Sequence, residues 1–166
     1  MKNRAAGIMV LAGIGLLSGA TAQPTGTDWK DWGGTGARMN YSSLNQITAA
    51  NVADLKPVWV WDSGKFGRTW QTRPLMIGGL LYFTESQSGD IIAMQPESGK
   101  LVWRTKPPVT VGAGVNRRGL AYWAGDGAMK PRIVAIWGHV MYGFDLKTGH
   151  PSSDWPETGL DIGLPN

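Results

Sequence analysis

The residues at positions 116–123 (NRRGLAYW) combine two adjacent arginines with a compact apolar and aromatic run. An arginine side chain stays charged at any working pH and is seldom buried without a partner. Arg117 or Arg118 could therefore supply a fixed positive charge to a pocket lined by the residues that follow. The alternative is that both arginines are solvated where a strand begins. The octet by itself leaves these two interpretations open.

The composition favours an all-β protein with short strands. Of the 166 residues, 24 are glycine and 9 are tryptophan, and only 17% are charged. Many turns, few charged helical faces and many large flat side chains are typical of such a fold. The chain has no cysteine, which excludes disulfides, thiolate metal sites and covalent haem attachment. With two histidines, a metal site built from several histidines is not expected.

The N-terminus has the pattern of a secretory signal peptide over residues 1–22. Lys2 and Arg4 precede an uncharged apolar run, and Ala20-Thr21-Ala22 provides small residues for a signal peptidase. The apolar run is too short to span a bilayer easily, although an uncut membrane anchor is the alternative. We therefore expect export to the periplasm, with an association with the inner membrane left open, and a mature domain over residues 23–166.

The charge of the chain argues against nucleic acid as a partner. The formal net charge is +4, and removal of Lys2 and Arg4 with the signal, a loss of two basic residues, would leave about +2. No run of basic residues exceeds two. Such a small and scattered charge does not indicate a nucleic-acid surface.

The elements that must position these residues change in character along the chain. Residues 23–36 predict an irregular arm whose indoles pack on the body. Residues 48–55 predict one or two helical turns with Thr48 as N-cap and a buried side of Ile47, Val52 and Leu55. The hydrophobic period then becomes two, which predicts β-strands. The expected strands cover residues 58–61, 75–77, 80–84, 90–94, 100–104, 119–123, 132–136 and 140–144.

Two of the turns echo each other and indicate a repeat. Residues 93–100 (AMQPESGK) parallel residues 143–150 (GFDLKTGH), each with a small residue six positions before a turn glycine. Trp103 lies four residues after Gly99, whereas Trp155 lies six residues after Gly149. A tryptophan after such a glycine can lie flat between neighbouring units. Four short strands and tight turns per unit match a propeller blade, although two unrelated β-turns are the alternative.

At this point the chain resembles the N-terminal part of the quinoprotein dehydrogenases that use pyrroloquinoline quinone (PQQ). The resemblance implies an eight-bladed β-propeller, of which this chain would form about two four-stranded blades and a short N-terminal helix. It spans about residues 29–150, which is most of the expected mature chain. The stretches that carry it are residues 41–47 with 51–55 and Trp59, residues 70–75 (WQTRPL), the two repeated turns, and the octet 116–123.

The resemblance implies a role for two residues. Arg118 matches the family's arginine, which lies beside the reactive carbonyls of the quinone and stabilises the negative charge that develops on oxygen during hydride transfer. Gln71 matches a Glu or Gln that hydrogen-bonds the carboxylate-bearing edge of the cofactor. A neutral amide can donate to a carboxylate, so glutamine suits that position. A solvated loop glutamine is the alternative.

One departure from the family bears on the substrate. Alcohol and methanol dehydrogenases of this family carry a vicinal cysteine pair shortly before the arginine motif, where this chain has Gly112 and Ala113. That difference favours a glucose-dehydrogenase-like enzyme, or one for other sugars and polyols. Family members are also several times longer, so we expect a truncated chain that is inactive alone. The family's Ca²⁺ ligands and catalytic aspartate are expected beyond residue 166.

The resemblance as a whole implies an oxidoreductase. We expect the N-terminal fragment of a periplasmic, PQQ- and Ca²⁺-dependent dehydrogenase that oxidises an alcohol, sugar or polyol. Its electrons would pass to ubiquinone or cytochrome c. The alternative is a non-catalytic propeller that acts as a scaffold or binding protein, for which the same repeats would lack a cofactor pocket.

Overall fold

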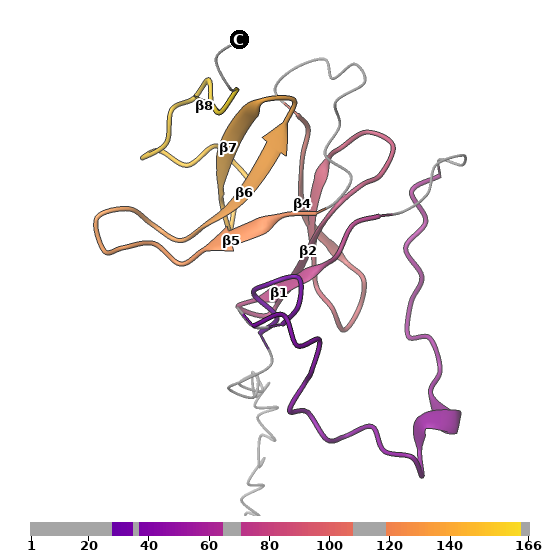
Figure 1. The fold of residues 1–166 in the computed structure, drawn as a ribbon. Coiled ribbons are helices and arrows are strands. Elements are labelled where there is room, and N and C mark those ends of the chain that lie inside the picture. Colours follow the sequence, from indigo (N-terminus) through magenta and orange to yellow (C-terminus); the bar gives the residue numbers. More distant parts are fainter. Residues whose placement is uncertain (1–27, 35–36, 65–70, 108–118, 164–166) are drawn as a thin grey trace, which may run out of the picture.

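The computed structural model describes residues 28–34, 37–64, 71–107 and 119–163, and its fold there is almost entirely β (Figure 1). Two four-stranded antiparallel sheets follow each other along the chain, in the orders β1-β2-β3-β4 and β5-β6-β7-β8. This confirms the expected all-β fold with two four-stranded units of a partial propeller. The strands are β1 (Leu75–Ile77), β2 (Leu80–Thr84), β3 (Ile91–Met94), β4 (Leu101–Thr105), β5 (Ala121–Trp123), β6 (Arg132–Trp137), β7 (Val140–Asp145) and β8 (Leu160–Asp161).

Tight turns follow several of the strands, and three of these turns share one design. Each begins with a polar residue whose backbone carbonyl accepts a hydrogen bond from the N–H of a glycine four positions later, at 2.9 Å in every case. The side chain of the first residue also accepts from the Ser or Thr that precedes the glycine. The turns are residues 85–89, 95–99 and 145–149. The repeat predicted for the last two is confirmed, and the first carries it as well.

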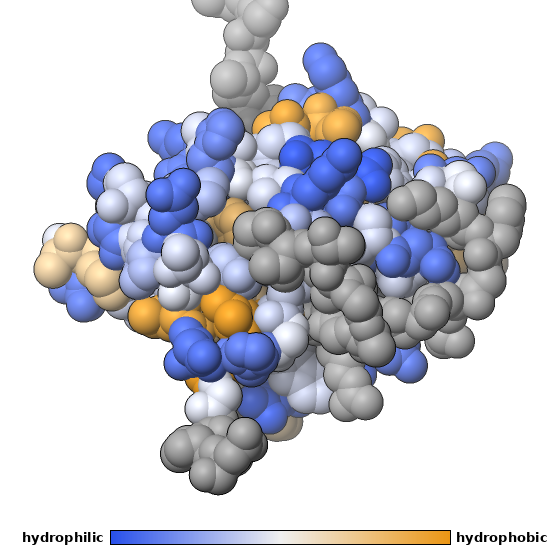
Figure 2. Space-filling model, turned by 90° about the horizontal axis from the view of Figure 1, so that it is seen from above, coloured by the Kyte–Doolittle hydropathy of each residue, from blue (hydrophilic) through white to orange (hydrophobic). Residues whose placement is uncertain are grey.

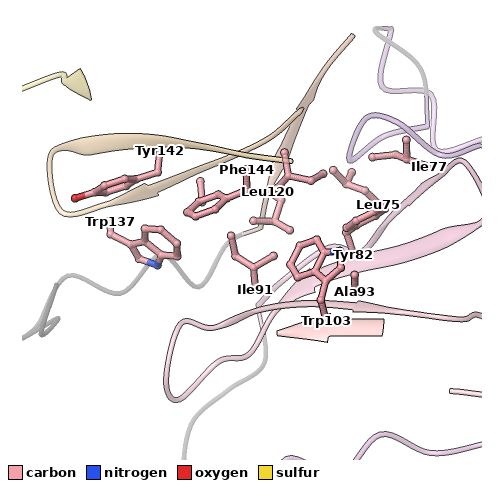
Figure 3. Close-up of a cluster of buried hydrophobic side chains, with 12 residues drawn as sticks. Leu75, Ile77, Tyr82, Ile91, Ala93, Trp103, Leu120, Trp137, Tyr142 and Phe144 are labelled. Atoms are coloured by element: carbon pink, nitrogen blue, oxygen red, sulfur yellow. The ribbon is translucent and has the colours of Figure 1, made fainter. Parts of the chain in front are cut away.

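The main core lies between the two sheets, where side chains of both units interdigitate (Figure 3). From β6 and β7, the rings of Trp137, Tyr142 and Phe144 pack together with centroids 5.3–6.4 Å apart. From the first sheet, Tyr82 and Trp103 face them at the same interface. Fifteen apolar residues of the described part are buried, and most of them belong to this one cluster. The two units are therefore stabilised chiefly by each other.

Two tryptophans hold one unit against the turn of the next. The Trp103 Nε1–H donates to the carbonyl of Leu146 at 2.9 Å, and a Cβ placed at Gly149 would overlap its ring. Trp59 does the same on the other turn, where its Nε1–H donates to the carbonyl of Pro96 at 2.7 Å and its ring covers Gly99. The prediction that a tryptophan lies flat between units is confirmed for Trp103.

Trp155 does not take that position. Its ring packs on Gly143, and its Nε1–H donates to the carbonyl of Met141 at 3.3 Å, so it covers its own sheet. The spacing explains the difference, because Trp155 lies two residues further from its turn glycine than Trp103 does.

The N-terminal part of the described chain differs most from expectation. The predicted helix is one 3-10 turn, η1 (Val52–Asp54), and the Thr48 side chain does not cap it. Ile47, Val52 and Leu55 are half or more exposed, so they share no buried side. Figure 1 shows why: this segment loops away from both sheets, and nothing in the described part packs on it.

The predicted strand at residues 58–61 was also wrong, but its period was right. Val58 and Val60 are each 82% exposed, while Trp59 and Trp61 are half-buried against Phe83, Ile92 and Met94. The segment alternates as a strand would, yet no neighbouring strand pairs with it in the described residues. The earlier arm meets β1 through its backbone, because Trp29 forms an isolated β-bridge with Met76. The Trp29 ring lies against Gly34 of the same arm, and Trp32 is 43% exposed.

Hydrophilic residues cover much of the coloured surface seen from above, with apolar patches between them (Figure 2). Within the described residues, the helical content is limited to η1, and no helix has the length and hydrophobicity of a membrane span. The predicted signal peptide at residues 1–22 lies outside the described residues.

Candidate functional site

A cavity of about 600 Å³ lies where the segment before β1 meets the start of β5. Its walls come from three parts of the chain that are far apart in sequence: the N-terminal arm, the approach to β1, and the first two strands of the second sheet. The lining residues are Trp32, Gln71, Arg73, Gly119, Leu120, Ala121, Val134 and Ile136. The cavity is large enough for a cofactor or a small substrate.

Gln71 reaches this cavity because the next residue is anchored in the sheet. Thr72 is 8% exposed, and its hydroxyl oxygen accepts hydrogen bonds from the N–H and the hydroxyl of Thr84, at 3.4 and 3.0 Å. Side chains alternate along an extended chain. With Thr72 turned into the sheet, Gln71 is exposed on the opposite side and lines the cavity. Gln71 therefore lines this cavity, and the cofactor-binding role predicted for it stays a prediction.

Gly119 brings the arginine motif to the same cavity. Its backbone has φ of +128°, and a Cβ there would lie 3.5 Å from the Arg73 carbonyl oxygen. Leu120 follows in the buried core, and Ala121 begins β5. The segment is thus held between the extended residues 71–73 and the core. Glycine suits this position because its φ lies in a region that other residues rarely adopt.

Arg118 and Arg117 lie outside the described residues, so the role predicted for Arg118 stays a prediction. The same holds for Gly112 and Ala113, which stand where some family members have cysteines. The residue after Arg118, Gly119, lines the cavity together with Gln71. The two sequence stretches that the resemblance singled out therefore meet in one place.

Arg73 is the cavity residue that sequence reasoning missed. Its guanidinium carbon lies 4.2 Å from the centre of the Trp32 ring, and its Nη1 donates to Asn40 Oδ1 at 3.5 Å. The signal was available: Arg73 lies two residues after Gln71, and a period of two puts both side chains on one face. The family resemblance drew attention to Gln71 alone.

The arginine that is buried among aromatic rings is Arg132. Its side chain is inaccessible, and its guanidinium carbon lies 5.0 Å from the ring centres of both Trp123 and Trp155. Its Nη2 donates to Asp154 Oδ2 at 2.7 Å. Hydrogen bonds from the Lys130 backbone N–H and from Arg132 lower the pKa of the Asp154 carboxyl, against the opposing effect of burial. These contacts make Arg132 a structural residue, because its buried guanidinium lies against two indole rings and pairs with Asp154.

The described residues contain no group of three or more histidine, cysteine, aspartate or glutamate side chains that could hold a metal ion. Among the described residues that line the cavity, Arg73 is the one that is charged. Leu120, Val134 and Ile136 supply an apolar surface, and Gln71 supplies a neutral amide. This arrangement suits a flat ligand that carries negative charge at one edge.

A family model described as the glucose, ethanol and alcohol dehydrogenase β-propeller domain with PQQ matches residues 29–163. The chain belongs to this family. Family membership agrees with the two four-stranded units and with the resemblance drawn over about residues 29–150.

Relatives of this dehydrogenase family include subunit 1 of the methanol dehydrogenase [cytochrome c] of Paracoccus denitrificans. It is 31% identical over 97% of this chain and 28% of its own length. The glycerol dehydrogenase large subunit of Gluconobacter oxydans is 34% identical over 51% of this chain and 12% of its own length. This chain therefore spans a quarter or less of the length of most of the curated relatives it matches.

Solved structures of the family show the same arrangement of strands. The quinohemoprotein alcohol dehydrogenase of Comamonas testosteroni matches with a TM-score of 0.61 and 29% identity, over 74% of this chain and 18% of its own. A europium-containing methanol dehydrogenase matches with a TM-score of 0.57 and 25% identity, over 74% of this chain and 22% of its own.

Proposed function

We propose that this chain is the N-terminal part of a PQQ-dependent dehydrogenase that oxidises an alcohol or polyol, and that the cavity is one wall of its cofactor site. The observation that carries the proposal is that Gln71 and Gly119, from the two stretches expected to face PQQ, line one cavity. The family to which the chain belongs supplies the reaction class.

The residues present fit such a cofactor. PQQ is a flat orthoquinone with carboxylates on its edges, and when bound it supplies a two-electron acceptor. In this chain the Gln71 amide would hydrogen-bond a carboxylate, and the apolar residues from β6 would exclude water from the ring. Arg118 would hold a fixed positive charge where negative charge develops on oxygen. A preorganised cation costs no reorganisation during the reaction, which is why an arginine suits that role.

The metal and the catalytic base would come from elsewhere in the complete protein. We expect Ca²⁺ as the metal, with its ligands and an aspartate base beyond residue 166. One solved relative is named for europium, so the identity of the ion is best tested by comparing Ca²⁺ with a lanthanide. The apolar residues of the N-terminal loop, such as Ile47 and Leu55, are exposed here and would be covered by the remaining blades.

The partners and location that we propose follow from the residues and from the relatives. Residues 1–22 would direct export to the periplasm. The relatives include dehydrogenases named for methanol, glycerol and alcohol, and some of these names also include cytochrome c or quinone. An alcohol or polyol substrate with ubiquinone or cytochrome c as acceptor is therefore our proposal. The preference for a glucose-like substrate rests on Gly112 and Ala113 alone and stays a prediction.

The experiment begins with the coding DNA after Asn166. An open frame with further blades, an aspartate base and metal ligands is expected. The complete protein is then purified and loaded with PQQ and Ca²⁺, and Arg118→Ala is compared with the neighbouring control Arg117→Ala. We expect Arg118→Ala to lower kcat by about a hundredfold or more, as for the loss of one charge-stabilising donor, and Arg117→Ala to have a small effect.

Equal effects of the two arginine variants would remove Arg118 from the mechanism. A stop codon directly after Asn166 would mean that this polypeptide is not a dehydrogenase by itself. A complete protein that binds no PQQ would favour the non-catalytic propeller instead.

A further inference from the structure

Arg73 and Gln71 lie on the same side of an extended segment and line the same cavity. The two side chains flank Thr72, which is buried and hydrogen-bonded to Thr84. Both are exposed on the side opposite Thr72, and both line the cavity. A ligand that meets the Gln71 amide therefore lies within reach of a guanidinium two residues further along the chain.

The Arg73 guanidinium is held in position rather than left to move freely. It stacks on the Trp32 ring with its central carbon 4.2 Å from the ring centre, and it donates through Nη1 to Asn40 Oδ1. Stacking on an aromatic face leaves the N–H groups at the edge of the guanidinium available as donors. Trp32 also lines the cavity, so the stack itself forms part of the wall.

The charge of Arg73 is not neutralised within the described part of the chain. The ion pairs found there join Lys30, Arg104 and Arg132 to aspartates, and His139 lies 3.8 Å from Asp161. The described lining of the cavity also contains no acidic residue. A fixed cation beside an apolar surface, with its donors unoccupied by a carboxylate, is the arrangement that recognises a ligand carboxylate.

We propose that Arg73, stacked on Trp32, is a carboxylate-binding residue of this cavity and acts together with the Gln71 amide. The identity of the ligand rests on the proposed function. The carboxylate could belong to the PQQ edge or to an acidic substrate, such as a hydroxy acid, because both present the same planar pair of oxygens to the guanidinium. Arg73 contacts the ligand in this proposal and takes no part in hydride transfer.

The chain offers a matched control for Arg73. Arg38 also lies over the Trp32 ring, at 5.5 Å, but it does not line the cavity. Both arginines can be changed to methionine, which keeps the length of the side chain and removes its charge and donors. Arg73→Lys keeps the charge but loses the planar fork.

The test measures binding to the complete protein by titration calorimetry, with two probes. One is PQQ, and the other is a pyridine dicarboxylate, which carries an acidic ring without a quinone. We expect Arg73→Met to weaken PQQ binding about tenfold or more, as for a lost charge-assisted hydrogen bond, and to reduce its dependence on salt. Arg73→Lys should lie in between, and Arg38→Met should change binding less than about twofold. Far-UV circular dichroism checks that each variant is folded.

The outcomes separate the two sources of the carboxylate. If PQQ binding is unchanged in Arg73→Met but KM rises for a hydroxy acid and not for a neutral alcohol, the carboxylate belongs to the substrate. If Arg73→Met matches Arg38→Met with PQQ, the pyridine dicarboxylate and both substrates, the proposal is wrong.

Failure of the proposed function looks different. In that case the unaltered protein binds the pyridine dicarboxylate, and loses that binding in Arg73→Met, but does not bind PQQ. If the unaltered protein binds neither probe, both proposals are wrong.

Discussion

Trp59 and Trp103 make the same contact in two parts of the molecule, but the chain holds them differently. Each indole donates to the carbonyl three residues before a turn glycine and covers that glycine. Trp103 belongs to β4 and is 8% exposed, and Tyr82 donates to the same Leu146 carbonyl beside it. Trp59 lies in a segment without strand partners in the described residues, between two valines that are each 82% exposed.

The comparison shows that the tryptophan contact and the strand pairing are separate interactions, and that the first can form without the second. The contact needs only a turn of the right shape and one indole, so it forms even where the segment is otherwise exposed. Pairing needs a neighbouring strand, which β4 has and residues 58–61 do not have in the described chain. Trp103 has both the indole contact and strand pairing, whereas Trp59 has the indole contact without strand pairing in the described chain.

The largest effect is expected from removing the two indoles. Trp103→Ala should lower the free energy of unfolding by about 4 kcal/mol, as for a large aromatic residue lost from a core. Trp59→Ala should cost about half as much, because its ring is only half-buried. Urea denaturation followed by far-UV circular dichroism measures both. Equal losses would contradict the distinction between the two contacts.

A smaller effect is expected from the glycines beneath the indoles. Gly149 and Gly99 have φ of +69° and +66°, and a Cβ at either would overlap a tryptophan ring. Replacement by alanine should cost about 3 kcal/mol at Gly149, through backbone strain and overpacking, and less at Gly99, where the ring can shift with its exposed segment.

Gly78→Ala is the matched control for these glycine variants. It has a similar φ of +56°, but nothing lies within 4 Å of the added Cβ. It should cost only the backbone strain of about 1–2 kcal/mol. Three equal losses would mean that the indoles yield freely and that φ alone explains the glycines.

The smallest effect concerns the charge of Asp145, which begins the turn at residues 145–149. Burial acts to raise the pKa of Asp145, but hydrogen bonds from the backbone and hydroxyl of Thr148 and from the Lys147 N–H outweigh it and hold the pKa below its ordinary value. The stabilisation is therefore present above about pH 4 and is lost as the pH falls through the lowered pKa. The equivalent residue of the other turn, Gln95, is neutral.

Asp145→Asn keeps the acceptor oxygen and removes the charge. We expect it to cost about 1 kcal/mol or less at pH 7, with the difference from the unaltered protein disappearing in acid. Gln95→Asn, which shortens the neutral side chain, should have an effect that does not change with pH. Thermal unfolding at several pH values from acid to neutral measures this. A pH-independent effect of Asp145→Asn would show that the charge does not matter.

Much of the fold could be predicted because it depends on local patterns. The strands from Leu75 to Asp145 follow a period of two between glycine turns, and the structure places them within a residue or two of the expected bounds. The repeated turns were also visible, since a polar residue, a hydroxyl residue and a glycine close each of them without help from the rest of the chain. The short strand β8 was missed, because two exposed residues carry no pattern.

The errors of prediction occur where a segment depends on something to pack against. Residues 47–55 have helical spacing of apolar residues, but only η1 forms where the described chain offers no surface to bury them. Arg132 was read as an ordinary strand residue, because nothing in the local sequence shows that Trp123 and Trp155 will both lie against its guanidinium.

The sequence by itself determined the family and the β-architecture, and it singled out Gln71 as a candidate, since these rest on local motifs and their order. Only the tertiary structure decided that Gln71, Gly119 and Trp32 line one cavity, and that Arg73 joins them. The reason is physical: a cavity is made by segments distant in sequence whose approach depends on packing between two sheets. A motif identifies candidate residues along the chain, but the packing between the two sheets determines which of them line the same cavity.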